Sequence, residues 1–122
     1  MTGSVTAGLQ AQIDLELLGS SGGPPRVEVV IDTGFNGELI LPRTLVAALA
    51  LNHLGTHHAM LADGRRVVFD YYEVSIRWHG PPRMVEVLQS GTIALLGMEL
   101  LQGSRFTMDT IQGGAVLIDE IP

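Results

Sequence analysis

Residues 9–17 alternate strictly between apolar odd positions and, between them, polar even positions. A period of two is typical of a β-strand with one buried and one solvent-facing side. A β-branched apolar run follows at residues 27–31, after a break rich in Gly, Ser and Pro at residues 19–25. We therefore expect two antiparallel strands joined as a hairpin, which favours a fold built from local β-pairing.

A second hairpin is expected around Asp63-Gly64, because Asp-Gly between two β-prone segments is a strong hairpin signal. Its arms are residues 57–61 and 67–78. The second arm is long, so the hairpin should project beyond the body of the protein.

Shorter segments complete the expected architecture. Further strands are expected at residues 39–41, 84–88, 93–96, 105–108 and 115–118, and short helices at residues 44–51, with Thr44 as a possible N-cap, and 98–102. The spacing indicates hairpins and not βαβ units, so we expect a mostly β fold of short strands. The length of 122 residues suits one domain, residues 1–122.

Two residue types are absent, and their absence removes several chemistries. The chain has no cysteine, and all 7 of its basic residues are arginine. Disulfides, thiolate nucleophiles, zinc fingers, the P-loop lysine and Schiff bases are therefore excluded. Catalysis would have to come from carboxylates, hydroxyls, histidines or a bound metal.

The charge pattern argues against nucleic acid as a partner. The formal net charge is -6, and Arg65-Arg66 is the only adjacent basic pair. No apolar run approaches the roughly 20 residues of a membrane span, and residues 1–10 lack the basic start and apolar middle of a signal peptide. We expect no membrane partner for this chain; the compartment is cytoplasmic or unknown.

Asp32-Thr33-Gly34 stands where the apolar run 27–31 ends. Gly34 permits a tight turn in which backbone N–H groups approach a carboxylate, and Thr33 offers a hydroxyl to a neighbouring segment. Such a turn would hold Asp32 ionised and rigid. The tripeptide alone also fits an ordinary turn capped by an Asx-type hydrogen bond.

The surroundings of this tripeptide are more specific. Residues 29–42 (VVIDTGFNGELILP) resemble the active-site segment of retropepsin-like (retroviral-type) aspartic proteases, in which apolar residues precede Asp-Thr-Gly and an apolar strand follows. Further along, Leu95, Leu96 and Gly97 resemble the family's apolar-apolar-Gly element, which packs behind the catalytic loop and opens a short helix. The order of these elements matches the family over nearly the whole chain.

The resemblance implies a closed or partly open acid-protease barrel of short strands and hairpins, with one or two short helices, that forms half of a two-fold dimer. It places the flap at the second hairpin, with Ala62, Asp63, Gly64 and Arg65 as candidate flap residues. Viral members have glycine-rich flap tips and a small residue after Asp-Thr-Gly. Here Gly64 is the one tip glycine and Phe35 follows the motif, as in bacterial and other cellular single-domain members.

Aspartic proteolysis needs two carboxylates that share one proton. This chain supplies Asp32, while the second Asp-Thr, at Asp109-Thr110, is followed by isoleucine in place of glycine. The resemblance therefore implies a homodimer, with Asp32 of each chain facing the other across a two-fold axis and Thr33 linking the two loops. The family's C-terminal strand often joins a dimer sheet, and residues 115–118 could do so.

Other candidate sites have weaker support. Gly55 interrupts any helix that would align His53 with His57, and adjacent histidines on a strand point to opposite faces, so structural histidines are favoured over a metal site. Tyr71, Tyr72 and Trp78 fit cross-strand packing, although one aromatic face could line a substrate groove.

The sequence thus favours an aspartic endopeptidase, active as a homodimer on extended peptide or protein substrates and needing no cofactor or metal. Two alternatives stay open. One is a non-proteolytic dimeric peptide-binding or interaction module with the same fold. The other is a monomeric β-rich interaction domain unrelated to proteases.

Overall fold

The computed structural model describes residues 1–19 and 25–122, which form ten β-strands and two short α-helices. The strands are β1 (Thr2–Val5), β2 (Ala11–Leu18), β3 (Arg26–Ile31), β4 (Leu39–Leu41), β5 (Asn52–Met60), β6 (Arg66–Arg77), β7 (Pro82–Gln89), β8 (Leu95–Leu96), β9 (Ser104–Met108) and β10 (Ala115–Glu120). The helices are α1 (Arg43–Leu49) and α2 (Met98–Leu101). In the described part of the chain, neither helix has the length and apolar character needed to cross a membrane.

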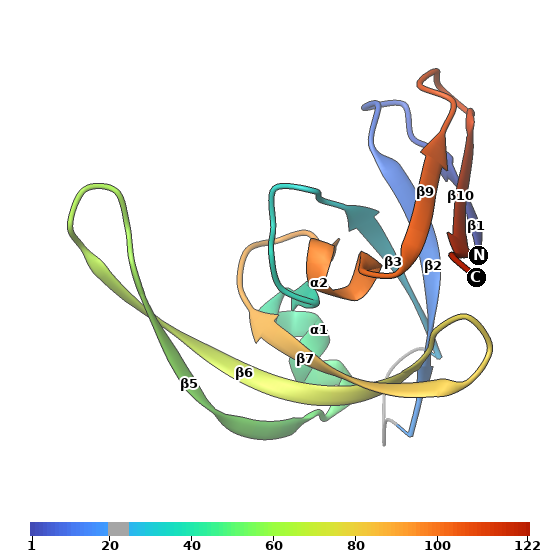
Figure 1. The fold of residues 1–122 in the computed structure, drawn as a ribbon. Helices are drawn as coiled ribbons and strands as arrows, with labels where there is room; N and C mark the ends of the chain where they lie inside the picture. Colours follow the sequence, from blue (N-terminus) through green and yellow to red (C-terminus); the bar gives the residue numbers. More distant parts are fainter. Residues whose placement is uncertain (20–24) are drawn as a thin grey trace.

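The strands pair into one sheet that curls into a ring. Neighbours run in the order β6-β7-β4-β8-β3-β2, and β2 then pairs with β6 to close the circle. The closing contact joins Leu17 to Ile76 and Leu18 to Ser75. Two extensions leave the ring: β5 adds to β6, and β1, β10 and β9 add to β2 (Figure 1). This architecture confirms the predicted mostly β barrel.

The core fills the inside of the ring because alternate residues of each strand face inward. In β2 the inward residues are Ala11, Ile13, Leu15 and Leu17, all buried. They pack with apolar residues of the facing strands and with Val46 and Leu49 of α1. Burying such side chains contributes about 1.5–3 kcal/mol each. From Ala11 to Leu17 the alternation therefore marks the inner face of the barrel.

The hairpin of β5 and β6 projects from the body, as its length predicted (Figure 1). Its tip closes with hydrogen bonds from Leu61 N–H to Arg65 O (2.8 Å) and from Gly64 N–H to Leu61 O (2.9 Å). Gly64 has φ +85°, a conformation that glycine adopts without steric cost. The first arm begins at Asn52, earlier than predicted, and a bulge lies between His53 and Gly55.

Several predicted bounds differ from the structure, among them the strand predicted at residues 93–96, which begins at Leu95. The strand predicted from residue 9 begins at Ala11, because Leu9 adopts φ +60° in the preceding turn. The helix predicted at 44–51 begins at Arg43, and Pro42, not Thr44, occupies its N-cap. Strand β1 was not predicted, since its residues have no apolar alternation. Of the predicted break at residues 19–25, positions 20–24 lie outside the described residues.

The N-terminal and C-terminal strands extend the sheet beside the ring. β1 lies between β2 and β10, and β10 lies between β1 and β9. Both edges of β10 are therefore occupied within the chain. Residues 115–118 were expected to be available for a dimer sheet, but β10 has no free edge to contribute.

Gly3 tests the docking of β1. A Cβ at this position would collide with the carbonyl oxygen of Gln12 and lie 2.7 Å from Ile13 Cγ2. We expect Gly3→Ala to lower the free energy of unfolding by about 1–3 kcal/mol, measured by urea denaturation. Gly8→Ala is the matched control, because its Cβ would meet only Thr6 Oγ1 at 3.8 Å. Equal stability of the two variants would contradict close packing of β1 on β2.

Candidate active site

Asp32 lies directly after β3, where the chain leaves the ring. Its backbone N–H donates to Leu96 O of β8 (2.9 Å), and Val30 N–H donates to Ala94 O (2.9 Å). The parallel pairing of β3 with β8 therefore continues up to Asp32 itself. Asp32 is half-buried, whereas Thr33 and Gly34 are exposed. The sheet thus presents this carboxyl group at a rigid strand end.

The Asp32 carboxyl group is held by its own loop. Gly34 N–H donates to Asp32 Oδ1 (2.9 Å), and Phe35 N–H donates to the Asp32 carbonyl (3.2 Å). Among the described residues, no hydrogen bond engages Asp32 Oδ2. One carboxyl oxygen is therefore oriented by the backbone, and the other is available to a water or to a second carboxyl group.

Helix α2 supports the loop from behind. The first N–H groups of a helix have no partner within the helix. Here Met98 N–H donates to Phe35 O (2.8 Å), and Glu99 N–H donates to Gly37 O (3.2 Å). Leu96 is fully buried below the loop, and Leu95 is half-buried. The apolar-apolar-Gly segment and the Asp32 loop, distant in sequence, are therefore directly hydrogen-bonded.

Phe35 has a structural role that the sequence analysis missed. A Cβ at Gly97 would lie 2.5 Å from Phe35 Cδ2 and 2.7 Å from Phe35 O, and a Cβ at Gly37 would lie 2.5 Å from Phe35 Cζ. The phenyl ring thus packs against two glycines. In the sequence, Phe35 stands two positions before Gly37, but nothing in this loop shows that Gly97 also contacts the ring.

Glu38 is a second residue that the sequence analysis missed. Its side chain is 13% exposed, and it pairs with Arg83 (Oε2 to Nη2, 2.9 Å) while Oε1 accepts the Glu86 N–H (2.9 Å). Its carbonyl accepts the Gly97 N–H (3.0 Å). Glu38 therefore connects the end of the loop to β7 and to the start of α2. A single acidic residue before an apolar strand gives no sign of this role.

A cavity of about 350 Å³ opens beside Asp32 and Thr33. Apart from Gln10 and these two residues its walls are apolar, and they come from the turn before β2 and from β2, β3, β8 and β9: Leu9, Ala11, Val30, Ile31, Leu95, Phe106 and Met108. An apolar cavity with one carboxyl group at its edge is typical of a binding site in which a few polar groups orient the ligand.

A row of half-buried apolar side chains runs from the Asp32 strand to the projecting hairpin. Residues directly opposite each other in paired strands lie on the same face. The row follows five such strands in the order Val30, Leu95, Ile40, Leu88 and Tyr71. All five are half-buried. Asp32 follows Val30 by two residues, so its side chain lies on the same face. The row therefore forms a continuous apolar floor between the carboxyl group and the hairpin.

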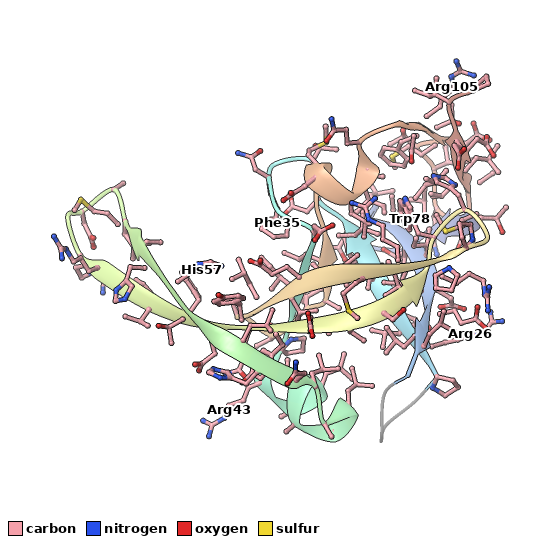
Figure 2. All side chains as sticks on the ribbon, turned by 60° about the horizontal axis from the view of Figure 1, so that its bottom comes forward. Arg26, Phe35, Arg43, His57, Trp78 and Arg105 are labelled. Carbon is pink, nitrogen blue, oxygen red and sulfur yellow. The ribbon has the colours of Figure 1, made fainter. Side chains whose placement is uncertain are left out.

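Polar groups cluster where this floor meets the hairpin. The His57 ring stacks on Tyr71 with centroids 3.9 Å apart, and His57 Nε2 lies 2.8 Å from Glu86 Oε1. Figure 2 shows His57 on the concave side of the hairpin. At the hairpin tip, Arg65 pairs with Asp63, and the candidate flap residues 62–65 are all exposed.

The histidines do not converge. His53 pairs with Asp70 (3.1 Å), and His79 lies 2.7 Å from Ser104 Oγ, far along the chain from His57. Within residues 1–19 and 25–122, no group of three or more His, Asp or Glu side chains is arranged to hold a metal ion. Trp78 belongs to the core, with 5% of its surface exposed.

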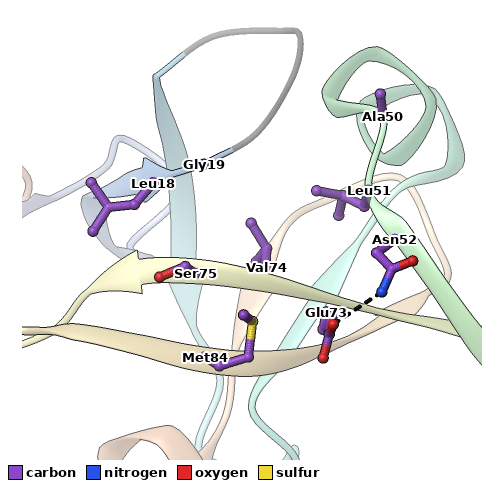
Figure 3. Close-up of a pocket in the computed structure, with 9 residues that line it drawn as sticks. All are labelled: Leu18, Gly19, Ala50, Leu51, Asn52, Glu73, Val74, Ser75 and Met84. Carbon is purple, nitrogen blue, oxygen red and sulfur yellow. Dashed lines mark hydrogen bonds between the residues drawn. The ribbon is translucent and has the colours of Figure 1, made fainter.

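Another cavity, of about 250 Å³, lies where the end of β2, the end of α1 and β6 meet (Figure 3). Asn52 Nδ2 donates to Glu73 Oε1 (3.0 Å) in its wall. Its lining contains no residue of the Asp32 loop. This cavity is therefore separate from the one beside Asp32.

Comparison with known proteins gives a structural match without a sequence match. No family model matches the sequence, and no curated protein matches it. A crystal structure of a retropepsin-like aspartic protease from Rickettsia conorii is similar, with a TM-score of 0.63 and 15% sequence identity. The similarity covers 98% of this chain and 89% of that chain. At this identity the likeness concerns the fold alone: the protein has a retropepsin-like fold.

Proposed function

We propose that the protein is an aspartic endopeptidase that acts as a homodimer, with Asp32 as the catalytic carboxyl group of each chain. The observation that carries this proposal is the Asp32 loop. Its carboxyl group stands at a strand end, one oxygen is oriented by Gly34 N–H at 2.9 Å, and an apolar cavity opens beside it. The retropepsin-like fold supports the same assignment.

The reaction needs two carboxyl groups, one ionised and one protonated. The ionised group takes a proton from a water molecule, which attacks the peptide carbonyl, and the protonated group donates to the carbonyl oxygen. The carboxyl group that took the proton from water then passes it to the departing nitrogen, and the other carboxylate takes a proton back from a hydroxyl of the intermediate. The C–N bond breaks, which releases an amine and a carboxylic acid. One chain contributes one Asp32, so the second carboxyl group comes from a second copy. Thr33 is exposed next to Asp32 and would bond the loop of the partner.

The substrate would be an extended peptide. It would lie over the apolar floor from Val30 to Tyr71, with residues 62–65 of the hairpin closing over it. An extended peptide exposes backbone N–H and C=O groups that can pair with strand backbone, and closure would exclude water from the reacting groups. Recognition through backbone pairing suits a protease that acts on unstructured segments.

Asp32→Asn tests the proposed chemistry. An amide cannot take a proton from water, so the rate of cleavage of an unfolded protein substrate should fall at least about a hundredfold. Mass spectrometry of the products, at pH values from acid to neutral, measures this rate. Asp14→Asn is the matched control, because Asp14 is exposed on β2 and lies away from the loop. The control should cleave at the wild-type rate.

Equal cleavage by wild type and Asp32→Asn would overturn the assignment. Absence of cleavage by a wild-type protein that sedimentation shows to be dimeric would instead favour the non-proteolytic peptide-binding module. A protein that sediments as a monomer at every concentration would favour the interaction domain.

Gly97→Ala tests the support of the loop. The added Cβ would meet backbone atoms of Phe35 and Gly37, which cannot move without displacing the loop. We expect the free energy of unfolding to fall by about 1–3 kcal/mol. The kcat of the folded protein should also fall, because the loop that carries Asp32 is displaced. In Gly37→Ala the clash is with the tip of the Phe35 ring, which can rotate away, so the effect should be smaller. The opposite order would contradict this account of the loop.

A further inference from the structure

In the described part of the chain the sheet has two edge strands, and one of them has no bulge. In the order of pairing, β5 ends one side of the sheet and β9 ends the other. Free strand edges invite pairing with another chain, and bulges are one means of preventing it. β5 carries such a bulge, between His53 and Gly55. β9 pairs with β10 in regular register at all five of its positions, without a bulge or a proline.

The free edge of β9 presents a defined set of backbone groups. Asp109 N–H donates to Ala115 O, and Gly103 O accepts from Ile121 N–H, so odd-numbered residues direct their backbone groups toward β10. The N–H and C=O groups of Ser104, Phe106 and Met108 therefore point away from β10. Among the described residues, no strand pairs with this side of β9.

This edge is adjacent to the Asp32 site. The side chains of Phe106 and Met108 line the cavity that also contains Asp32 and Thr33. Pairing along β9 would therefore place another chain beside the catalytic loop. Leu9, whose side chain is 59% exposed, lines the same cavity and would be covered by that chain.

We propose that the outer edge of β9 pairs antiparallel with β9 of a second copy of this chain, and that this contact brings the two Asp32 loops together. The inference rests on the proposed function for its expectation of a second copy. A two-fold axis at Thr107 places Phe106 opposite Met108 of the partner subunit, which allows four backbone hydrogen bonds.

The same axis makes the charges complementary. Arg105 and Asp109 lie equally far from Thr107, so Arg105 of each chain faces Asp109 of the partner subunit. Both side chains are exposed in the single chain. The contact thus contains two symmetric ion pairs, which favour this register over a shifted one. Two copies of a chain with net charge -6 repel each other, so these cations have particular value at the contact.

Charge reversal tests the register. Arg105→Asp and Asp109→Arg should each raise the dimer dissociation constant at least about tenfold, measured by sedimentation equilibrium on the full chain. The double variant restores opposite charges and should recover affinity close to the wild type. Arg43→Asp, an equal change of charge on the exposed start of α1, should leave the dissociation constant unchanged.

Met108→Pro tests the backbone pairing. It removes an N–H that points outward, so the pairing of β9 with β10 keeps its hydrogen bonds and the thermal unfolding of the monomer should stay near the wild type. Dimerisation should weaken by at least about tenfold, because two symmetric hydrogen bonds are lost and the ring obstructs the approach of the partner.

Wild-type affinity in Arg105→Asp and Met108→Pro would overturn the proposal, as would a wild-type protein that is monomeric at all concentrations. Variants that dimerise normally but no longer bind a peptide substrate would assign the β9 edge to substrate instead. If the β9 variants dissociate while the wild-type dimer cleaves no peptide, the β9 contact stands and the proposed protease activity fails.

Discussion

Backbone hydrogen bonds between the Asp32 loop and the segment from Leu96 to Glu99 hold the candidate site together. Leu96 fixes the start of the loop through the Asp32 N–H, and the first turn of α2 binds the carbonyls of Phe35 and Gly37. These bonds require close approach of two backbones, which the absence of a Cβ at Gly97 permits. The position of the carboxyl group therefore depends on a contact between segments far apart in the chain.

Closure of the barrel gives the two faces of each strand different environments: one face is buried in the core and the other faces outward. Inward residues such as Leu39 and Val87 are fully buried and stabilise the ring. Their neighbours Ile40 and Leu88 are half-buried on the other face, in the row that leads to Asp32. One set of short strands thus supplies both the core and an apolar row that leads to the candidate site.

The strand with an unpaired edge is the one through which the sheet can pair with another chain. Because β10 is paired on both sides, the strand that the sequence suggested for dimer contacts is internal, and β9 takes the edge position. The sequence could not distinguish them, since both are short apolar segments near the C-terminus. Which strand is free depends on where β1 inserts, and β1 itself lacks the alternation by which strands are recognised.

The sequence by itself determined the mostly β class, the two main hairpins and the Asp-Thr-Gly loop, because period-two alternation and turn residues act locally. It also excluded thiol and lysine chemistry outright. Tertiary structure decided the packing of Phe35 between two glycines, the tie from Glu38 to Arg83 and the free edge of β9. Each of these depends on pairing or packing between segments that are distant in the chain, which local sequence patterns do not specify.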